Sequence, residues 1–341
     1  MINDKKGLCL FEWVVLGYCA FTLLLMALLW GRLVQPMPML MGRVGIVALT
    51  IALWQLHRRW PSRWTMMLRV TAQLALLGWW YPDTYEFNRL FPNLDHLFAS
   101  AEEALFGCQP AQVFSQQCTS PLISEPLSLG YVSYFPMIAT VALYYFIRHH
   151  DRFTHCAFVI LGSFFLFYVI FIFLPVAGPQ FYYAAVGTEQ IAQGVFPDIG
   201  HHFLTHQEVL PIPGADGVFH NLVQIAHDAG KRPTAAFPSS HIGASVVLLW
   251  LAWEVRAHWL LAVLGVLTTL MFFATFYIQA HYAIDAISGI FVGTAFYFLL
   301  SNVHKLKLKR QTTDSAETSE TTDSTDTAET SEATNSTDFT D

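Results

Sequence analysis

Residues 154–176 read THCAFVILGSFFLFYVIFIFLPV, a run of 23 positions without one Asp, Glu, Lys or Arg. A run of about 20 apolar residues is long enough to cross a lipid bilayer as a helix. Seven further runs of similar character precede and follow it. We therefore predict an all-α fold, a polytopic membrane helix bundle with about eight transmembrane helices. The predicted spans lie near 10–33, 39–57, 64–81, 127–147, 154–176, 239–256, 259–279 and 283–303.

Composition supports a membrane protein. Hydrophobic residues make up 54% of the chain and charged residues 13%, against about 45–50% and about 25% in soluble domains. The formal net charge of -7 comes from the end of the chain, where the last 31 residues hold nine of the 25 acids. From Gln311 onward the sequence is too polar to bury surface, so we predict a disordered acidic tail.

Basic residues in the short connections indicate the orientation. They cluster in six places that all fall on one side of the predicted bundle: Lys5 and Lys6, Arg58 and Arg59, Arg63, Arg148 and Arg152, Arg256, and the segment 305–310. Positive residues stay on the cytoplasmic side of a membrane. We therefore expect both termini in the cytoplasm, with the long connections 82–126 and 177–238 on the extracytoplasmic, periplasmic or lumenal, face.

These patterns divide the chain into four regions. Residues 1–81 hold N-terminal transmembrane helices, 82–126 form an extracytoplasmic loop, 127–304 form a catalytic transmembrane domain, and 305–341 form a basic juxtamembrane stretch and the Thr/Ser/Asp/Glu tail. The loop 82–126 contains Cys108 and Cys118, which are candidates for a disulfide in an oxidising compartment. It also contains Arg89, Asp95 and Glu125, whose roles the sequence does not assign.

Two histidines stand at the ends of predicted spans. His241 opens one span in FPSSH, residues 237–241, and His281 precedes the last span in HYAID, residues 281–285. They are 40 positions apart, which is the length of two helical crossings of about 20 residues each. Both histidines therefore lie at one membrane face. Asp285 follows His281 by four residues, a spacing that lets a carboxylate hold one imidazole nitrogen while the other attacks.

The approach to the first histidine has the character of an anion site. Ser239 and Ser240 are candidates either for helix capping or for hydrogen bonds to a phosphate. Just upstream, Lys231 and Arg232 place two positive charges on the outer face, where a phosphate clamp would use them.

These motifs resemble those of the type-2 phosphatidic acid phosphatase superfamily, over roughly residues 125–302. The resemblance implies that His281 is a nucleophile that becomes phosphorylated, that His241 protonates the leaving group, and that Asp285 orients the nucleophile. The stretches 175–182 and 236–241 are similar to the branch that contains inositol phosphorylceramide synthases. Three positions depart from the superfamily pattern: Ile225 replaces a lysine, Thr275 replaces an arginine, and Gln180 lies where an arginine is common.

The predicted reaction is a two-step displacement at phosphorus. With a lipid hydroxyl as acceptor the enzyme is a head-group transferase, for which the resemblance implies phosphatidylinositol as donor and ceramide as acceptor. With water as acceptor it is a lipid phosphate phosphatase. Thr275 favours the transferase, because a phosphodiester carries less charge than a phosphomonoester.

Two other classes remain open. His201, His202 and His206 are candidate metal ligands, since 202 and 206 have helical spacing, and a transporter or channel would use the histidines as a proton path. Our leading hypothesis has no metal and no cofactor. No nucleotide-binding motif occurs, and nucleic-acid binding has no support.

Overall fold

The structure is a computed structural model that describes residues 7–214, 217–230 and 232–333. In these residues it is helical, with no strand. The helices are α1 Leu10–Leu29, α2 Pro36–Arg59, α3 Arg63–Ala75, α4 Leu77–Asn88, α5 Asp95–Phe106, α6 Pro110–Gln117, α7 Pro121–Val132, α8 Tyr134–Arg148, α9 Phe153–Phe173, α10 Pro179–Val186, α11 Thr188–Ala192, α12 Val218–Gly230, α13 Ser240–Glu254, α14 His258–Tyr277 and α15 Ala283–Ala333. One compact unit ends at Phe298, and a second begins at Leu299.

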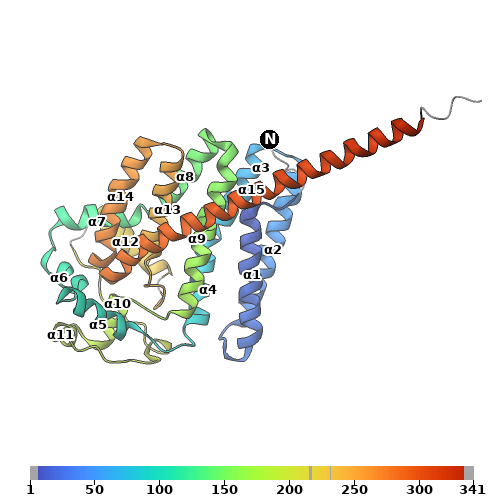
Figure 1. Ribbon diagram of the computed structural model, residues 1–341. Helices are drawn as coiled ribbons and strands as arrows, with labels where there is room; N and C mark the ends of the chain where they lie inside the picture. The colour runs from blue at the N-terminus through green and yellow to red at the C-terminus, as the bar shows by residue number, and fades with distance from the viewer. Residues whose placement is uncertain (1–6, 215–216, 231, 334–341) are drawn as a thin grey trace, which may run out of the picture. The chain divides into compact units, whose positions relative to one another are not determined.

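Helix α9 forms the centre of the first unit. It is apolar on every face, as the charge-free stretch requires, and it packs against α1, α3 and α4 as well as α8 and α13 (Figure 1). A helix that is hydrophobic all round is buried among other helices. The short helices α5, α6, α10 and α11 gather at one end of the bundle.

The predicted count of eight spans is not reached. In the part of the chain that the structure describes, five helical segments are long and apolar enough to cross a membrane, or six if α7 and α8, bent by 47°, form one span. The two remaining predicted spans do not meet this criterion, each for its own reason. Helix α13 has 15 residues, about 22 Å at 1.5 Å per residue, which is short of the roughly 30 Å hydrocarbon core. The predicted span 64–81 is broken between α3 and α4, and these helices carry charge.

Those charges in the N-terminal helices are buried and paired. Arg43 Nη2 lies 2.6 Å from Asp83 Oδ2, and Arg69 forms an ion pair with Glu12. Thr22 accepts a further hydrogen bond from Arg43 at 3.0 Å. Burying an ion is costly unless it is paired and hydrogen-bonded, so these pairs explain how polar helices pack inside an apolar bundle.

Two further predictions need correction. The segment 82–126 is mostly helical, because it contains α5, α6 and the start of α7. Cys108 and Cys118 are both free thiols. They flank the eight-residue helix α6, whose length of about 12 Å exceeds the reach of a disulfide. In the second unit α15 continues as helix to Ala333.

Candidate active site

His281 lies in the turn between α14 and α15 and is only 3% exposed. Its Nδ1 is 2.7 Å from the carbonyl oxygen of Ala236, and its main-chain N–H donates to the carbonyl of Thr275 at 3.1 Å. A carbonyl only accepts, so Nδ1 carries the proton and Nε2 keeps its lone pair. Burial lowers the pKa of His281 to about 4, which leaves the imidazole neutral at pH 7.

His241 meets this lone pair from the first turn of α13. Its Nδ1 lies 3.3 Å from His281 Nε2, and the two rings cross at 70°. Tyr131 and Tyr134 also pack against His241, with ring centroids at 4.8 and 4.5 Å. The two histidines that the sequence singled out are therefore adjacent, in an aromatic surrounding.

Glycines allow the two helices that follow these histidines to approach closely. A Cβ on Gly289 would lie 2.6 Å from the Ser239 carbonyl oxygen, and one on Gly293 would lie 2.3 Å from the Gly243 carbonyl oxygen. Small residues permit such backbone contact between membrane helices. The Ser239 N–H then donates to the carbonyl of Asp285 at 3.0 Å, which fixes the start of α13 against the start of α15.

Asp285 is fully buried but does not hydrogen-bond His281. Its Oδ2 lies 3.8 Å from His281 Nδ1 and accepts from the Tyr282 N–H at 2.8 Å. A separation of 3.8 Å is too long for a hydrogen bond. The i, i+4 argument applies within a helix, and His281 precedes α15, which begins at Ala283. The Ala236 carbonyl is the hydrogen-bond partner instead, and an orienting role for Asp285 stays a prediction.

Three of the four predicted phosphate ligands lie in the part of the chain that the structure describes. Ser239 caps α13, since its Oγ accepts from the Ile242 N–H at 3.5 Å. Ser240 is buried next to it, whereas Arg232 is exposed. Lys231 lies outside the described residues. A phosphate-binding role for these residues therefore stays a prediction, with helix capping observed for Ser239.

The loop 176–178 supports Ala236, and sequence reasoning missed it. Ala236 donates its N–H to the Val176 carbonyl at 3.0 Å. Gly178 has φ 93° and ψ 165°, a conformation that is essentially restricted to glycine. A Cβ there would lie 2.5 Å from the Ala280 carbonyl oxygen and 3.3 Å from the Ala236 Cβ. The signal in the sequence was a glycine between two prolines, Pro175 and Pro179, in the stretch 175–182 that was noted only for its resemblance.

Gly178→Ala is expected to lower kcat by about tenfold or more, because displacing the residue before His281 misaligns the predicted nucleophile. It should also destabilise the protein by about 1–3 kcal/mol through backbone strain. Thermal unfolding and turnover measure the two effects. Gly187→Ala is the matched control, since Gly187 has φ 100° but open space around its Cβ position. Equal activity loss in both variants would show that strain, and not the contact with Ala280, matters.

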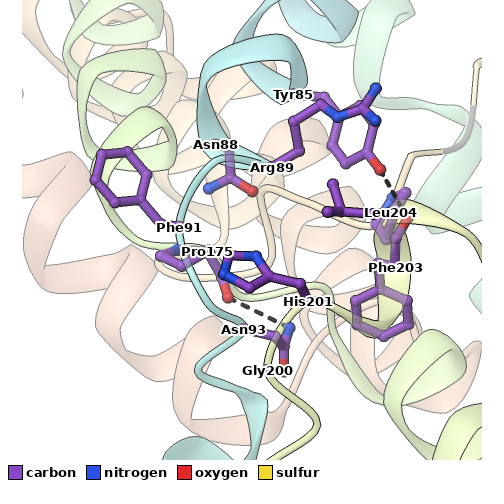
Figure 2. A pocket seen from close by; sticks show the side chains of 11 residues that line it. Tyr85, Asn88, Arg89, Phe91, Asn93, Pro175, Gly200, His201, Phe203 and Leu204 are labelled. Carbon is purple, nitrogen blue, oxygen red and sulfur yellow. Dashed lines mark hydrogen bonds between the residues drawn. The ribbon is translucent and has the colours of Figure 1, made fainter. Parts of the chain in front are cut away.

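The predicted histidine trio 201, 202 and 206 does not converge. His202 and His206 stack with ring centroids 4.6 Å apart, while His201 lines a separate pocket with Arg89, Asn93 and Pro175 (Figure 2). Among the residues that the structure describes, no three His, Cys, Asp or Glu side chains form a metal-binding group.

An apolar bundle with helices long enough to cross a membrane is the framework of an integral membrane protein. The family model described as PAP2 superfamily matches residues 98–299, which is more than half of the chain, so the protein belongs to the PAP2 superfamily. It is a phosphoryl-transfer or hydrolase enzyme of membrane lipids.

Two other comparisons add little. No curated protein gave a match. Among solved structures the chain is similar to the first transmembrane PAP2 type phosphatidylglycerolphosphate phosphatase from Bacillus subtilis, with 15% identity and a TM-score of 0.35 over 62% of this chain and 92% of that chain.

Proposed function

We propose that the protein is a membrane lipid phosphotransferase that works through a phosphohistidine on His281. The observation that carries this proposal is the contact between His281 Nε2 and His241 Nδ1 at 3.3 Å, with His281 Nδ1 held by the Ala236 carbonyl. The His281 imidazole is neutral and oriented for attack on phosphorus. The His241 imidazole lies where the leaving group needs a proton.

The reaction has two displacements at phosphorus. In the first, His281 Nε2 bonds to phosphorus while the bond to the lipid alkoxide breaks, and His241 gives its proton to that alkoxide. The anionic phosphate of a bound donor favours the protonated form of His241 that this step requires. In the second, neutral His241 takes the proton of an acceptor hydroxyl, whose oxygen bonds to phosphorus as His281 leaves. Both histidines return to their starting state.

The residue at position 275 supports a phosphodiester donor. Thr275, which stands where the resemblance places an arginine, is fully buried, and its hydroxyl donates to the Phe272 carbonyl at 2.8 Å. Its carbonyl accepts from the His281 N–H, so the position adjoins the nucleophile. A diester needs fewer cationic partners than a monoester. With the resemblance to inositol phosphorylceramide synthases, this supports phosphatidylinositol as donor and ceramide as acceptor.

We also propose that the site faces the extracytoplasmic side and that both termini are cytoplasmic. Arg152 of the α8–α9 connection lies 3.6 Å from Glu254 at the end of α13. Arg63 at the start of α3 stacks on Phe146 near the end of α8. The basic connections thus share one end of the bundle, whereas His241 lies at the opposite end of α13. The positive-inside rule then supports the proposed orientation.

Product analysis tests the choice of acceptor. Purified protein is supplied with phosphatidylinositol labelled in its phosphoinositol group, with and without ceramide. We expect label in a lipid that forms only when ceramide is present, because the acceptor hydroxyl must compete with water for the phosphoenzyme. Matched reactions contain diacylglycerol in place of ceramide. Release of water-soluble inositol phosphate at the same rate with or without ceramide would make the enzyme a hydrolase.

A further inference from the structure

Helix α5 buries two acids on one face. Asp95 and Glu102 are both 0% exposed, as is Ala99 between them. Seven residues are about two helical turns, so both side chains project in the same direction. Within the described residues neither carboxylate forms an ion pair with a cation. A buried carboxylate without a cation is expensive, which calls for a specific function at this face.

Asp95 joins two segments of the active site. It accepts hydrogen bonds from the main-chain N–H groups of Ala177 and Gly178 at 2.7 and 2.8 Å, from Asn93 Nδ2 at 2.5 Å, and from the Tyr282 hydroxyl at 3.0 Å. Gly178 supports the Ala236 segment, and Tyr282 follows the nucleophile directly. One carboxylate therefore connects the loop behind His281 to the residue after His281.

Glu102 caps the helix that follows the nucleophile. Its Oε1 accepts from the Ala283 N–H at 2.5 Å, and the nearby Ile284 N–H also lowers the pKa of this carboxyl. Ala283 is the first residue of α15, and the first N–H groups of a helix lack partners inside the helix. Glu102 thus supplies from α5 the acceptor that the start of α15 needs.

We propose that Asp95 and Glu102 are positioning residues, an α5 clamp that holds the turn 280–284 so that His281 Nε2 faces His241. The catalytic part of this proposal rests on the proposed function, whereas the mechanical part does not. Asp95 lies before residue 98, where the match to the superfamily begins. The α5 clamp thus includes a residue from outside the region that defines the family.

Burial destabilises the charged form of Glu102, which supports a role in positioning and not in stability. Burial raises the pKa of Glu102 to about 7, while the N–H bonds of Ala283 and Ile284 act against this rise. The charged form accepts these bonds more strongly than the neutral form. The titratable groups that act on it are Glu103 on α5, Asp285 on α15 and Tyr183 on α10.

The test combines backbone exchange with kinetics. Hydrogen–deuterium exchange of the Ala283 and Ile284 amides is measured in full-length protein carrying Glu102→Ala, Glu102→Gln or Asp95→Asn. We expect exchange at these amides to rise about tenfold in Glu102→Ala, the effect of losing one hydrogen bond to a charged group. Glu102→Gln keeps an acceptor oxygen and should recover most of the protection. Asp95→Asn should raise exchange at Gly178.

Turnover then separates positioning from substrate binding. Glu102→Ala and Asp95→Asn should lose about ten- to a hundredfold in kcat, as small misplacements of reacting groups do, with KM unchanged, whereas Glu102→Gln should keep most of its kcat. Glu103→Gln is the matched control, because Glu103 is the neighbouring acid and contacts only Gln109 among its side-chain partners. Wild-type exchange and kcat in Glu102→Ala would overturn the α5 clamp. If the unmodified protein turns over no lipid, the proposed function fails, and the exchange measurement still decides the mechanical part.

Discussion

His281→Ala is expected to abolish turnover, with kcat at least about 10⁴-fold lower, the size of loss seen when a nucleophile is removed. His241 does not replace it in the described structure, because His241 directs its Nδ1 toward His281 and packs its ring against tyrosines. The variant should also fail to form the phosphoenzyme. Labelled donor followed by a rapid alkaline quench detects the phosphohistidine, which is stable in base and labile in acid.

The control for this variant is His206→Ala. His206 is exposed and stacks only on His202 among the described ring contacts, so its removal should leave both turnover and labelling intact. Phosphoenzyme that persists in His281→Ala would refute the assignment of the nucleophile. Loss of labelling in both variants would point to a folding defect, which the thermal unfolding curve of each variant identifies.

That the two histidines lie at the same end of the bundle was predictable from helix lengths alone. Helix α13 and helix α14 are joined by a short turn, and each histidine lies within a few residues of the far helix end. Sequence spacing therefore determines that His241 and His281 share one end of the bundle. The spacing does not determine that the rings touch, which depends on the glycine contact between α13 and α15.

The partner of His281 Nδ1 was not predictable in the same way. The sequence suggested Asp285 because a carboxylate has a recognisable identity at a recognisable spacing. The observed acceptor is the carbonyl of Ala236, and every residue carries a carbonyl. Only the folded structure, in which Val176 and Gly178 contact Ala236, shows which carbonyl faces the imidazole.

Helix α5 escaped prediction because its buried face is polar. Helices are found in sequences by apolar residues at helical spacing, whereas α5 buries Asp95 and Glu102 at that spacing. The prediction of a span at 64–81 was wrong for a related reason. Arg69 is paired with Glu12, a residue 57 positions away, and hydropathy does not reveal whether a charge has a distant partner.

His241→Ala is expected to reduce lipid turnover by about 10²–10⁴-fold, the contribution of a positioned general acid. The reason is that an alkoxide leaving group needs a proton in the first displacement, and His241 Nδ1 is 3.3 Å from the attacking nitrogen. An aryl phosphodiester releases a phenolate that needs no proton. In this variant we therefore expect the aryl substrate to phosphorylate His281 at nearly the wild-type rate.

The second displacement should still fail in His241→Ala, because no base remains to take the proton of the acceptor hydroxyl. The phosphoenzyme should then accumulate with a burst of one phenolate per active site, which rapid-mixing absorbance measures. Tyr131→Phe is the matched control, since it keeps the ring that stacks on His241 at 4.8 Å. If the aryl substrate and the lipid lose activity equally in His241→Ala, then His241 contributes to binding or to packing and not to proton transfer. A burst seen only in His241→Ala would separate the two displacements. It would also assign the proton transfer in each displacement to His241.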